Sequence, residues 1–310
     1  MKKNIAFILI IFFSITTISF TFENRILIKI DNEIITTIDI SNQVNYLITI
    51  NPKIKELKEQ KILEIAEQTI IKEKIKKLEI LQRIKKIDIE DKYLYEYLKT
   101  KYQPLGFKDK NNFEDYLEIN DLDISIIKEK VSIELLWNQL IYEKFSKNIK
   151  IDKEEIKNNI LNKNNQKTKK YLLSEIVFQV SSDENVDQKY DEIKMEINQN
   201  GFENAATIYS VSNTSVSGGK IGWIKENSLS DKIKKAVSET EIGNYSKPVQ
   251  LPSGFLILYV NDIEEINENL NLDIEKEIAQ NIKILTEQQL NDFSNIYFNK
   301  IKNNFLISET

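Results

Sequence analysis

A pair of adjacent glycines, Gly218 and Gly219, constrains the fold of this chain more than any other feature of its sequence. Only 7 of the 310 residues are glycine and 4 are proline, which favours long helices with few tight turns. Glycine adopts positive φ angles without the steric cost of a Cβ atom. The pair therefore predicts a tight turn that leads straight into a packed strand at Lys220–Ile224.

The first half of the chain has the apolar periodicity of helices. Spacings of three and four predict a long helix over residues 53–86, and further helices over 88–102 and 123–145. Before them, two alternating runs predict a hairpin with strands at 25–31 and 34–36. The helix that follows the hairpin is predicted to be capped by Thr37 or Asp39.

The second half of the chain has a different pattern, in which predicted strands alternate with short helices. A polar stretch at residues 157–168 has little apolar content and predicts a linker. After it, the pattern predicts strands at 171–180, 220–224 and 255–260, helices at 186–199, 202–209 and 231–237, and a helical tail that runs to about residue 302.

The chain contains no cysteine and no histidine. These absences exclude disulfides, thiolate nucleophiles, His-ligated zinc and catalytic triads built on histidine. The net charge of −5 argues against a nucleic-acid partner, which a basic face would favour. The sequence has no glycine-rich phosphate loop, so we expect no nucleotide, and it gives no sign of a metal or other cofactor.

The N-terminus has the pattern of a secretory signal peptide at residues 1–21. Lys2 and Lys3 precede an apolar run, Ile5–Phe13, and small polar residues follow up to Ser19. We therefore expect export to the periplasm, after which the segment is either cleaved or kept as an N-terminal membrane tether. No later segment has the roughly 18 apolar residues that a spanning helix needs.

Five motifs between residues 169 and 264 resemble the parvulin family of proline isomerases. The most specific is Ser217–Trp223 (SGGKIGW), which is similar to the S-x-G-G-x-L-G-W turn and strand of that family. The other four are Leu173–Val177 (LSEIV), Phe202–Ala206 (FENAA), Ile242–Val249 (IGNYSKPV) and Ser253–Leu258 (SGFLIL). The resemblance implies a parvulin domain with a small four-stranded antiparallel sheet and surrounding helices.

The parvulin resemblance also points to site residues, and two of them depart from the family. Active parvulins carry two facing histidines, whose positions are occupied here by Glu175 and Leu256. The resemblance implies Ser210, Ser212 and Ser253 as polar neighbours of the site. It implies a substrate pocket made of Leu229, Ile233, Val237, Phe255 and Trp223.

An ionised carboxylate in an apolar pocket is costly without a partner. We therefore expect Glu175 to point toward solvent or to pair with a nearby lysine.

The first half of the chain resembles the helical chaperone domain of SurA-like proteins. Ile30–Ile40 (IDNEIITTIDI) is similar to the hairpin that opens that domain. The resemblance implies an α+β fold: a helical SurA-like domain at 22–156, the linker, a parvulin domain at 169–264, and a C-terminal segment, 265–310, that returns to complete the helical domain.

The resemblance implies an ATP-independent periplasmic chaperone that binds extended segments of unfolded exported and outer-membrane polypeptides. Its parvulin domain would be weak or inactive; an active peptidyl-prolyl isomerase and a membrane-tethered scaffold are the alternatives. Aromatic residues suit promiscuous peptide binding, although we expect at least half of those in the helical domain to be core residues. They are Tyr93, Tyr95, Tyr97, Tyr102, Phe107, Phe113, Tyr116 and Trp137.

Overall fold

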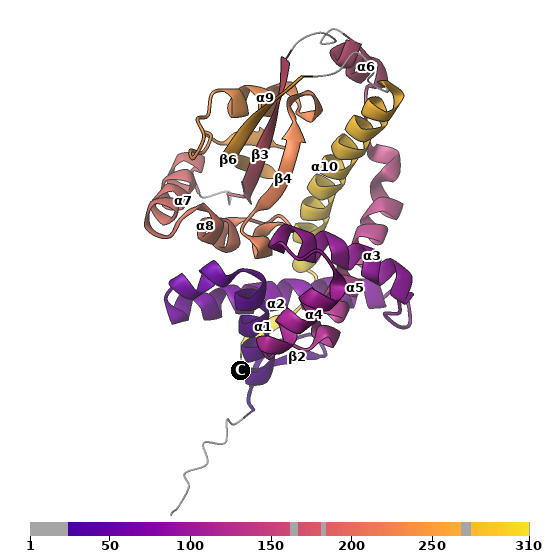
Figure 1. The fold of residues 1–310 in the computed structure, drawn as a ribbon. Coiled ribbons are helices and arrows are strands. Elements are labelled where there is room, and N and C mark those ends of the chain that lie inside the picture. Colours follow the sequence, from indigo (N-terminus) through magenta and orange to yellow (C-terminus); the bar gives the residue numbers. More distant parts are fainter. Residues whose placement is uncertain (1–23, 162–166, 181–183, 268–273, 310) are drawn as a thin grey trace, which may run out of the picture.

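The structure is a computed structural model that describes residues 24–161, 167–180, 184–267 and 274–309. A helical part and a four-stranded antiparallel sheet lie one above the other, and the long helix α10 (Ile274–Lys302) runs beside both (Figure 1). The α+β class predicted from the sequence is confirmed. The predicted signal peptide, residues 1–21, lies outside the described residues.

The helical part begins with a short hairpin and continues through six helices. Its elements are β1 (Ile26–Ile30), β2 (Glu33–Thr36), α1 (Thr37–Ile50), α2 (Glu59–Leu81), α3 (Asp91–Tyr102), α4 (Lys110–Ile119), α5 (Ile124–Phe145) and α6 (Lys153–Leu161). The cap of α1 is Thr36, not Thr37 or Asp39. The Thr36 side chain accepts from the backbone N–H of Asp39, whose carboxylate accepts in return from the N–H of Thr36, a reciprocal capping box.

Two predicted boundaries in this part are wrong for identifiable reasons. The helix expected over 53–86 is divided into a short 3₁₀ turn, Pro52–Glu56, and α2. Leu57 separates the two, because its backbone is extended and its side chain is buried. The linker expected at 157–168 is helical as far as Leu161 and is already in a strand from Lys167. Residues 162–166 lie outside the described part of the chain.

The C-terminal segment packs into the core of the helical part. The indole Nε1 of Trp137 on α5 donates to Ser294 Oγ on α10 at 2.8 Å, and the rings of Phe145 and Phe293 stack with centroids 5.1 Å apart. The last strand, β7 (Ile307–Glu309), pairs antiparallel with β1. The two ends of the described chain therefore meet in one three-stranded sheet, ordered β2-β1-β7.

The second sheet is ordered β4-β3-β6-β5, with all neighbours antiparallel. Its elements and helices are β3 (Lys167–Phe178), α7 (Val186–Asn200), α8 (Phe202–Tyr209), β4 (Lys220–Lys225), α9 (Asp231–Ser238), β5 (Val249–Leu251) and β6 (Gly254–Asn267). Side chains alternate between the two faces of a strand. One face of this sheet packs in a cluster with α9, and the other in a cluster with α7 and α8.

The glycine turn positions β4 as the sequence predicts. Gly218 and Gly219 have φ angles of +70° and +77°, and a Cβ added at Gly219 would lie 2.2 Å from the carbonyl oxygen of Glu175. The backbone N–H of Glu175 donates to the carbonyl of Gly219 at 2.8 Å. The close approach of two backbones therefore requires glycine here, and it holds the turn directly beside Glu175.

The sheet part docks on the helical part through α8 and the loop that follows it. Lys53 forms an ion pair with Glu203 on α8, with N···O 3.0 Å. On α2, Lys72 donates to the carbonyl of Val211 at 2.7 Å. No helix in the described part of the chain combines the length and the apolar character that crossing a membrane requires.

Candidate functional site

The strand pairing brings Glu175 and Leu256, where the parvulin resemblance implies the two histidines, onto one face of the second sheet. Glu175 on β3 lies opposite Leu258 on β6, and Val177 lies opposite Leu256. Because residues two apart share a face, Glu175 and Leu256 are diagonal neighbours. The sequence therefore identified two positions that the fold does bring together.

Glu175 is held by two hydroxyl groups from the loop that follows α8. Ser212 Oγ donates to its Oε1 at 2.7 Å, and Thr214 Oγ1 donates to the same oxygen at 3.0 Å. The expectation that Glu175 points to solvent or pairs with a lysine is wrong. Both hydrogen bonds reach the same carboxyl oxygen, Oε1, and they come from neutral hydroxyls rather than from a countercharge.

The environment of Glu175 favours its protonated form. Desolvation raises the pKa of the Glu175 carboxyl above its ordinary value, and the charge of Asp292 raises it further, while the bonds from Ser212 and Thr214 lower it. Burial outweighs the hydroxyl donors, so the net direction is upward. The site thus contains a carboxyl group that takes up a proton more readily than an exposed one.

The other two predicted serines serve different partners. Ser210 Oγ accepts a hydrogen bond from the backbone N–H of Val177 at 3.0 Å. This bond joins the end of α8 to strand β3. Ser253 donates to the Asp292 carboxylate on α10 in a short hydrogen bond. Desolvation raises the pKa of Asp292, and the bonds from Ser253 lower it.

Three of the predicted pocket residues form one apolar cluster with Leu256. Leu229, Ile233 and Val237 have exposed fractions of 8%, 8% and 0%, and Leu256 is 4% exposed. This cluster covers the face of the sheet that carries Glu175. These four side chains are therefore packed in the core of the rotamase domain rather than on an open surface.

The remaining two predicted pocket residues lie elsewhere. Phe255 neighbours Leu256 in sequence and therefore points to the opposite face of β6, where its ring stacks on Phe178 with centroids 5.6 Å apart. Trp223 is 44% exposed, and the Lys170 ammonium lies 4.7 Å from its ring centroid. Neither ring belongs to the cluster around Leu256.

Two residues that shape this site, Thr214 and Asp292, were not predicted from the sequence. Thr214 lies in the polar loop after α8, where a shift of one residue decides which hydroxyl reaches Glu175. Asp292 lies on α10, 39 residues from its partner Ser253. Only the tertiary arrangement brings α10 beside the turn between β5 and β6, so no local pattern could have identified Asp292.

Comparison with known proteins finds a family match over the second sheet and its helices. Residues 169–262 match the Rotamase family, described as the PPIC-type PPIASE domain. The Chaperone SurA of Pseudomonas putida is 23% identical over 229 residues, which cover 70% of this chain and 53% of that protein. The chain is similar to the SurA chaperones and contains a PpiC-type rotamase domain.

Two further SurA-like relatives show how far the likeness extends. The Chaperone SurA of Nitrosococcus oceani is 26% identical over 161 residues, which cover 49% of this chain and 38% of the relative. The chain thus spans about half, or less, of the length of these SurA relatives. A solved SurA-like chaperone from Campylobacter jejuni is 14% identical, with 93% of this chain and 99% of that chain covered and a TM-score of 0.33.

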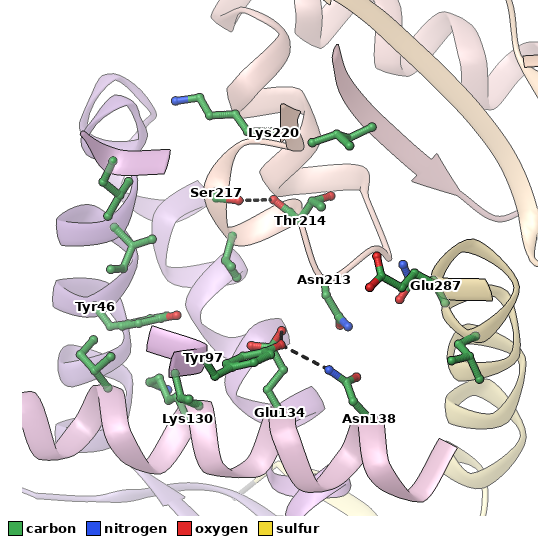
Figure 2. Close-up of a pocket in the computed structure, with 18 of the residues that line it drawn as sticks. Tyr46, Tyr97, Lys130, Glu134, Asn138, Asn213, Thr214, Ser217, Lys220 and Glu287 are labelled. Carbon is green, nitrogen blue, oxygen red and sulfur yellow. Dashed lines mark hydrogen bonds between the residues drawn. The ribbon is translucent and has the colours of Figure 1, made fainter. Parts of the chain in front are cut away.

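The rotamase domain and the helical part of this SurA-like chain line a partly open cavity of about 510 Å³. Figure 2 shows Glu134 and Asn138 on α5 facing Asn213, from the loop after α8, and Glu287 on α10. Tyr97, one of the aromatic residues singled out from the sequence, also lines this cavity. The cavity lies beside the same loop that carries Ser212 and Thr214.

The eight aromatic residues of the helical part divide between core and surface. Trp137, Phe113 and Tyr102 are buried, with exposed fractions of 0%, 1% and 4%. Tyr93 is 61% exposed. The other four are partly buried: Tyr95, Tyr97, Phe107 and Tyr116.

Proposed function

We propose that this SurA-like chain is an ATP-independent periplasmic chaperone that binds extended segments of unfolded exported proteins, outer-membrane proteins among them. The observation that carries the proposal is the pair of Glu175 and Leu256 at the histidine positions of an otherwise complete rotamase fold. The likeness to the SurA chaperones supports it. Client binding belongs to the helical part and the cavity it shares with the rotamase domain.

The rotamase domain has weak activity or none in this proposal. Rotating a prolyl bond crosses a barrier of about 20 kcal/mol, and a catalyst lowers it with polar groups aimed at the twisted amide. Leu256 has no polar side-chain atom. The hydroxyl protons of Ser212 and Thr214 are both directed to Glu175, away from any substrate.

One observation favours the alternative, an active peptidyl-prolyl isomerase. Glu175, Ser212 and Thr214 form a connected polar floor beside the apolar cluster of Leu229 and Ile233. A protonated Glu175 would have a hydrogen-bond donor of its own. The two readings differ in one measurable quantity, the rate of prolyl isomerisation.

The proposal includes export by residues 1–21, a helical domain at 22–156 that 265–310 completes, and a rotamase domain at 169–264. Packing of α10 against Trp137 and pairing of β7 with β1 support the discontinuous helical domain. Mass spectrometry of the N-terminus of the native protein distinguishes a cleaved signal from a retained membrane tether. A mature N-terminus near residue 22 is the expected result.

An aggregation assay tests the chaperone function. A porin-like β-barrel protein is diluted from urea, and light scattering is followed with increasing amounts of the full chain in the absence of ATP. We expect scattering to fall with increasing concentration of the chain, whereas an unrelated protein at equal mass should leave it unchanged. No suppression at a several-fold excess would refute the proposed function.

A further inference from the structure

A second cavity, of about 560 Å³, lies where α2, α10 and the end of α8 meet. Its volume falls in the range of about 300–1,000 Å³ that is typical of ligand pockets. Its lining comes mainly from residues 61–72 of α2, residues 207–211 at the end of α8, and residues 295–302 of α10. The loop whose hydroxyl groups hold Glu175 therefore begins in the wall of this cavity.

The charges that line this cavity are mostly positive. Four lysines and one glutamate line it. Lys61 pairs with that glutamate, Glu64, at 3.2 Å, and Lys189 pairs with a glutamate of its own helix, α7, at 2.9 Å. Lys72 and Lys302 form no ion pair in the part of the chain that the structure describes. Two positive charges of the lining are thus without a carboxylate partner among the described residues.

The Lys72 amine lies at the junction of the three parts. Its Nζ donates to the carbonyl of Val211 at 2.7 Å and lies 5.8 Å from the ring centroid of Phe298 on α10. Val211 and Phe298 both line the cavity. The other hydrogen atoms of the amine have no acceptor among the described residues. They are available to a ligand that supplies acceptor atoms of its own.

The surroundings of Lys72 favour a negatively charged neighbour. Desolvation lowers the pKa of Lys72 to about 7, and the charge of Lys76 acts in the same direction, while the charge of Glu134 opposes it. A carboxylate beside this amine would favour its protonated form. Lys302 adds a second positive charge, four residues after Phe298 and on the same side of α10.

Two side-chain amides of the lining also lack partners. Gln68 on α2 and Asn295 on α10 form no side-chain hydrogen bond within the described residues. An amide group can both donate and accept. Such groups suit the backbone of an extended peptide, which needs a partner for every N–H and C=O that leaves water.

We propose that this cavity binds a carboxylate group of an extended client segment. The positive charges of Lys72 and Lys302 attract the carboxylate, and the amides of Gln68 and Asn295 bind the adjoining backbone. The carboxylate is either the C-terminus of the client or the side chain of an aspartate or glutamate, which present the same two acceptor oxygens. This inference rests on the proposed chaperone function and adds a preference to it. A client cation in the same place is repelled.

The test compares four peptides of one extended, uncharged ten-residue sequence, each with a neutral label at its N-terminus. The first ends in a free carboxylate and the second in an amide. The third and fourth also end in an amide and carry one internal Glu or one internal Lys. Fluorescence anisotropy measures their affinity for the full chain at low and high salt.

We expect at least one of the two carboxylate peptides to bind about fivefold more tightly than the uncharged amide peptide. The Lys peptide should bind more weakly than the amide peptide, and all these differences should shrink as salt increases. Comparison of the first and third peptides identifies the source of the carboxylate.

Substitutions locate the preference in the cavity. Lys302 is exposed, so Lys302→Gln should leave the fold intact. We expect this variant to weaken binding of the preferred carboxylate peptide about threefold and to leave the amide peptide unchanged. The matched control is Lys300→Gln, which removes the same charge from an exposed position in the same last turn of α10, outside the cavity lining. It should change neither affinity. Lys72→Met should weaken only the carboxylate peptide.

The outcomes separate this inference from the proposed function. Equal affinity for the amide peptide and both carboxylate peptides overturns the preference and leaves the chaperone function standing. An equal effect of Lys300→Gln and Lys302→Gln also overturns it, because the preference would then come from overall charge. If no peptide binds but client aggregation is suppressed, the preference alone is wrong. If aggregation is not suppressed either, both the preference and the proposed function are wrong.

Discussion

Glu175 occupies a position where the parvulin resemblance implies a histidine. Its carboxyl group accepts two hydrogen bonds, from the hydroxyl groups of Ser212 and Thr214. It lies on the face of the sheet that carries the apolar cluster around Leu256. A neutral imidazole can both donate and accept a hydrogen bond, whereas an ionised carboxylate can only accept. The two hydroxyl groups direct their hydrogen bonds inward to Glu175, and only the protonated form of Glu175 has a proton to donate toward a substrate.

The raised pKa of Glu175 predicts a pH-dependent effect of Glu175→Gln on stability. The folded state binds the Glu175 proton more tightly than the unfolded state does. Above the raised pKa the carboxylate is ionised and lowers the stability of the fold. This loss of stability disappears below the ordinary pKa of a glutamate, where the carboxyl group is protonated in both states. Glutamine can still accept from both hydroxyls. We expect the variant to be more stable at pH 7, by about 1–3 kcal/mol, and to show no advantage at pH 3.5.

Urea denaturation of both proteins at the two pH values measures this effect. Glu241→Gln, at an exposed position between α9 and β5, is a control for loss of one carboxylate. An advantage of Glu175→Gln that is equal at both pH values would contradict the account of Glu175.

Some residues of the site could be predicted from the sequence, and others could not. The positions of Glu175 and Leu256 follow from motifs on two strands, because strand residues keep their register within a family fold. Phe255 was misassigned because one step along a strand reverses the direction of the side chain. Thr214 and Asp292 were not found, since their contacts depend on a loop conformation and on a helix distant in sequence.

At the scale of elements, short segments with a clear apolar pattern were predicted well. The helix predicted over 202–209 is α8 as observed. The strand expected at 255–260 continues to Asn267, because its polar half is held by pairing with β3 rather than by apolar alternation. The ion pair between Lys170 and Glu264, with N···O 2.6 Å, lies in this added stretch.

The packing of α5 against α10 predicts the cost of removing Trp137. Its side chain is fully buried, and its indole donates to Ser294 across the two helices. We expect Trp137→Ala to lower the free energy of unfolding by about 3–5 kcal/mol. Trp137→Phe should cost less, because it keeps most of the volume and loses mainly the hydrogen bond.

Urea denaturation followed by circular dichroism compares these variants. Tyr142→Ala is the matched control on the same helix, because Tyr142 is 55% exposed. It should change stability by no more than about 0.5 kcal/mol. Equal losses for Trp137→Ala and Tyr142→Ala would show that α10 does not pack on α5 as described.

At the scale of the whole molecule, the junction between the helical part and the rotamase domain contains two neighbouring lysines. Lys72 donates to Val211, and Lys76 donates to Asn213 at 3.2 Å. Desolvation, followed by the charge of Lys76, lowers the pKa of Lys72 to about 7, while Glu134 opposes this shift. The junction therefore holds an amine that resists protonation when the parts are docked.

Lys72→Met should make the stability of the molecule less dependent on pH. The unfolded chain binds the Lys72 proton more tightly than the folded one, so this residue's contribution to stability rises as pH increases from about 7 toward the ordinary value of 10.5. The stability advantage of the Met variant over the natural protein should be largest at or below pH 7 and should shrink steadily as the pH rises toward 10.5.

Thermal unfolding of both proteins at pH 6.5 and 9.5 measures the change. Lys85→Met, at an exposed position beyond the end of α2, is the control and should give the same difference from the natural protein at both pH values. An advantage of Lys72→Met that grows with pH would contradict the docked position of Lys72. No local pattern in the sequence predicts this junction, because it depends on how two separately recognisable parts meet.

The most direct test of the central claim is a protease-coupled isomerase assay on a proline tetrapeptide. The full natural chain is compared with the double variant Glu175→His, Leu256→His. We predict that the natural chain leaves the uncatalysed rate unchanged, and any acceleration by the double variant would support the positions assigned to the two histidines. Acceleration by the natural chain that disappears in Ser212→Ala would contradict the account and establish an isomerase that works without imidazole.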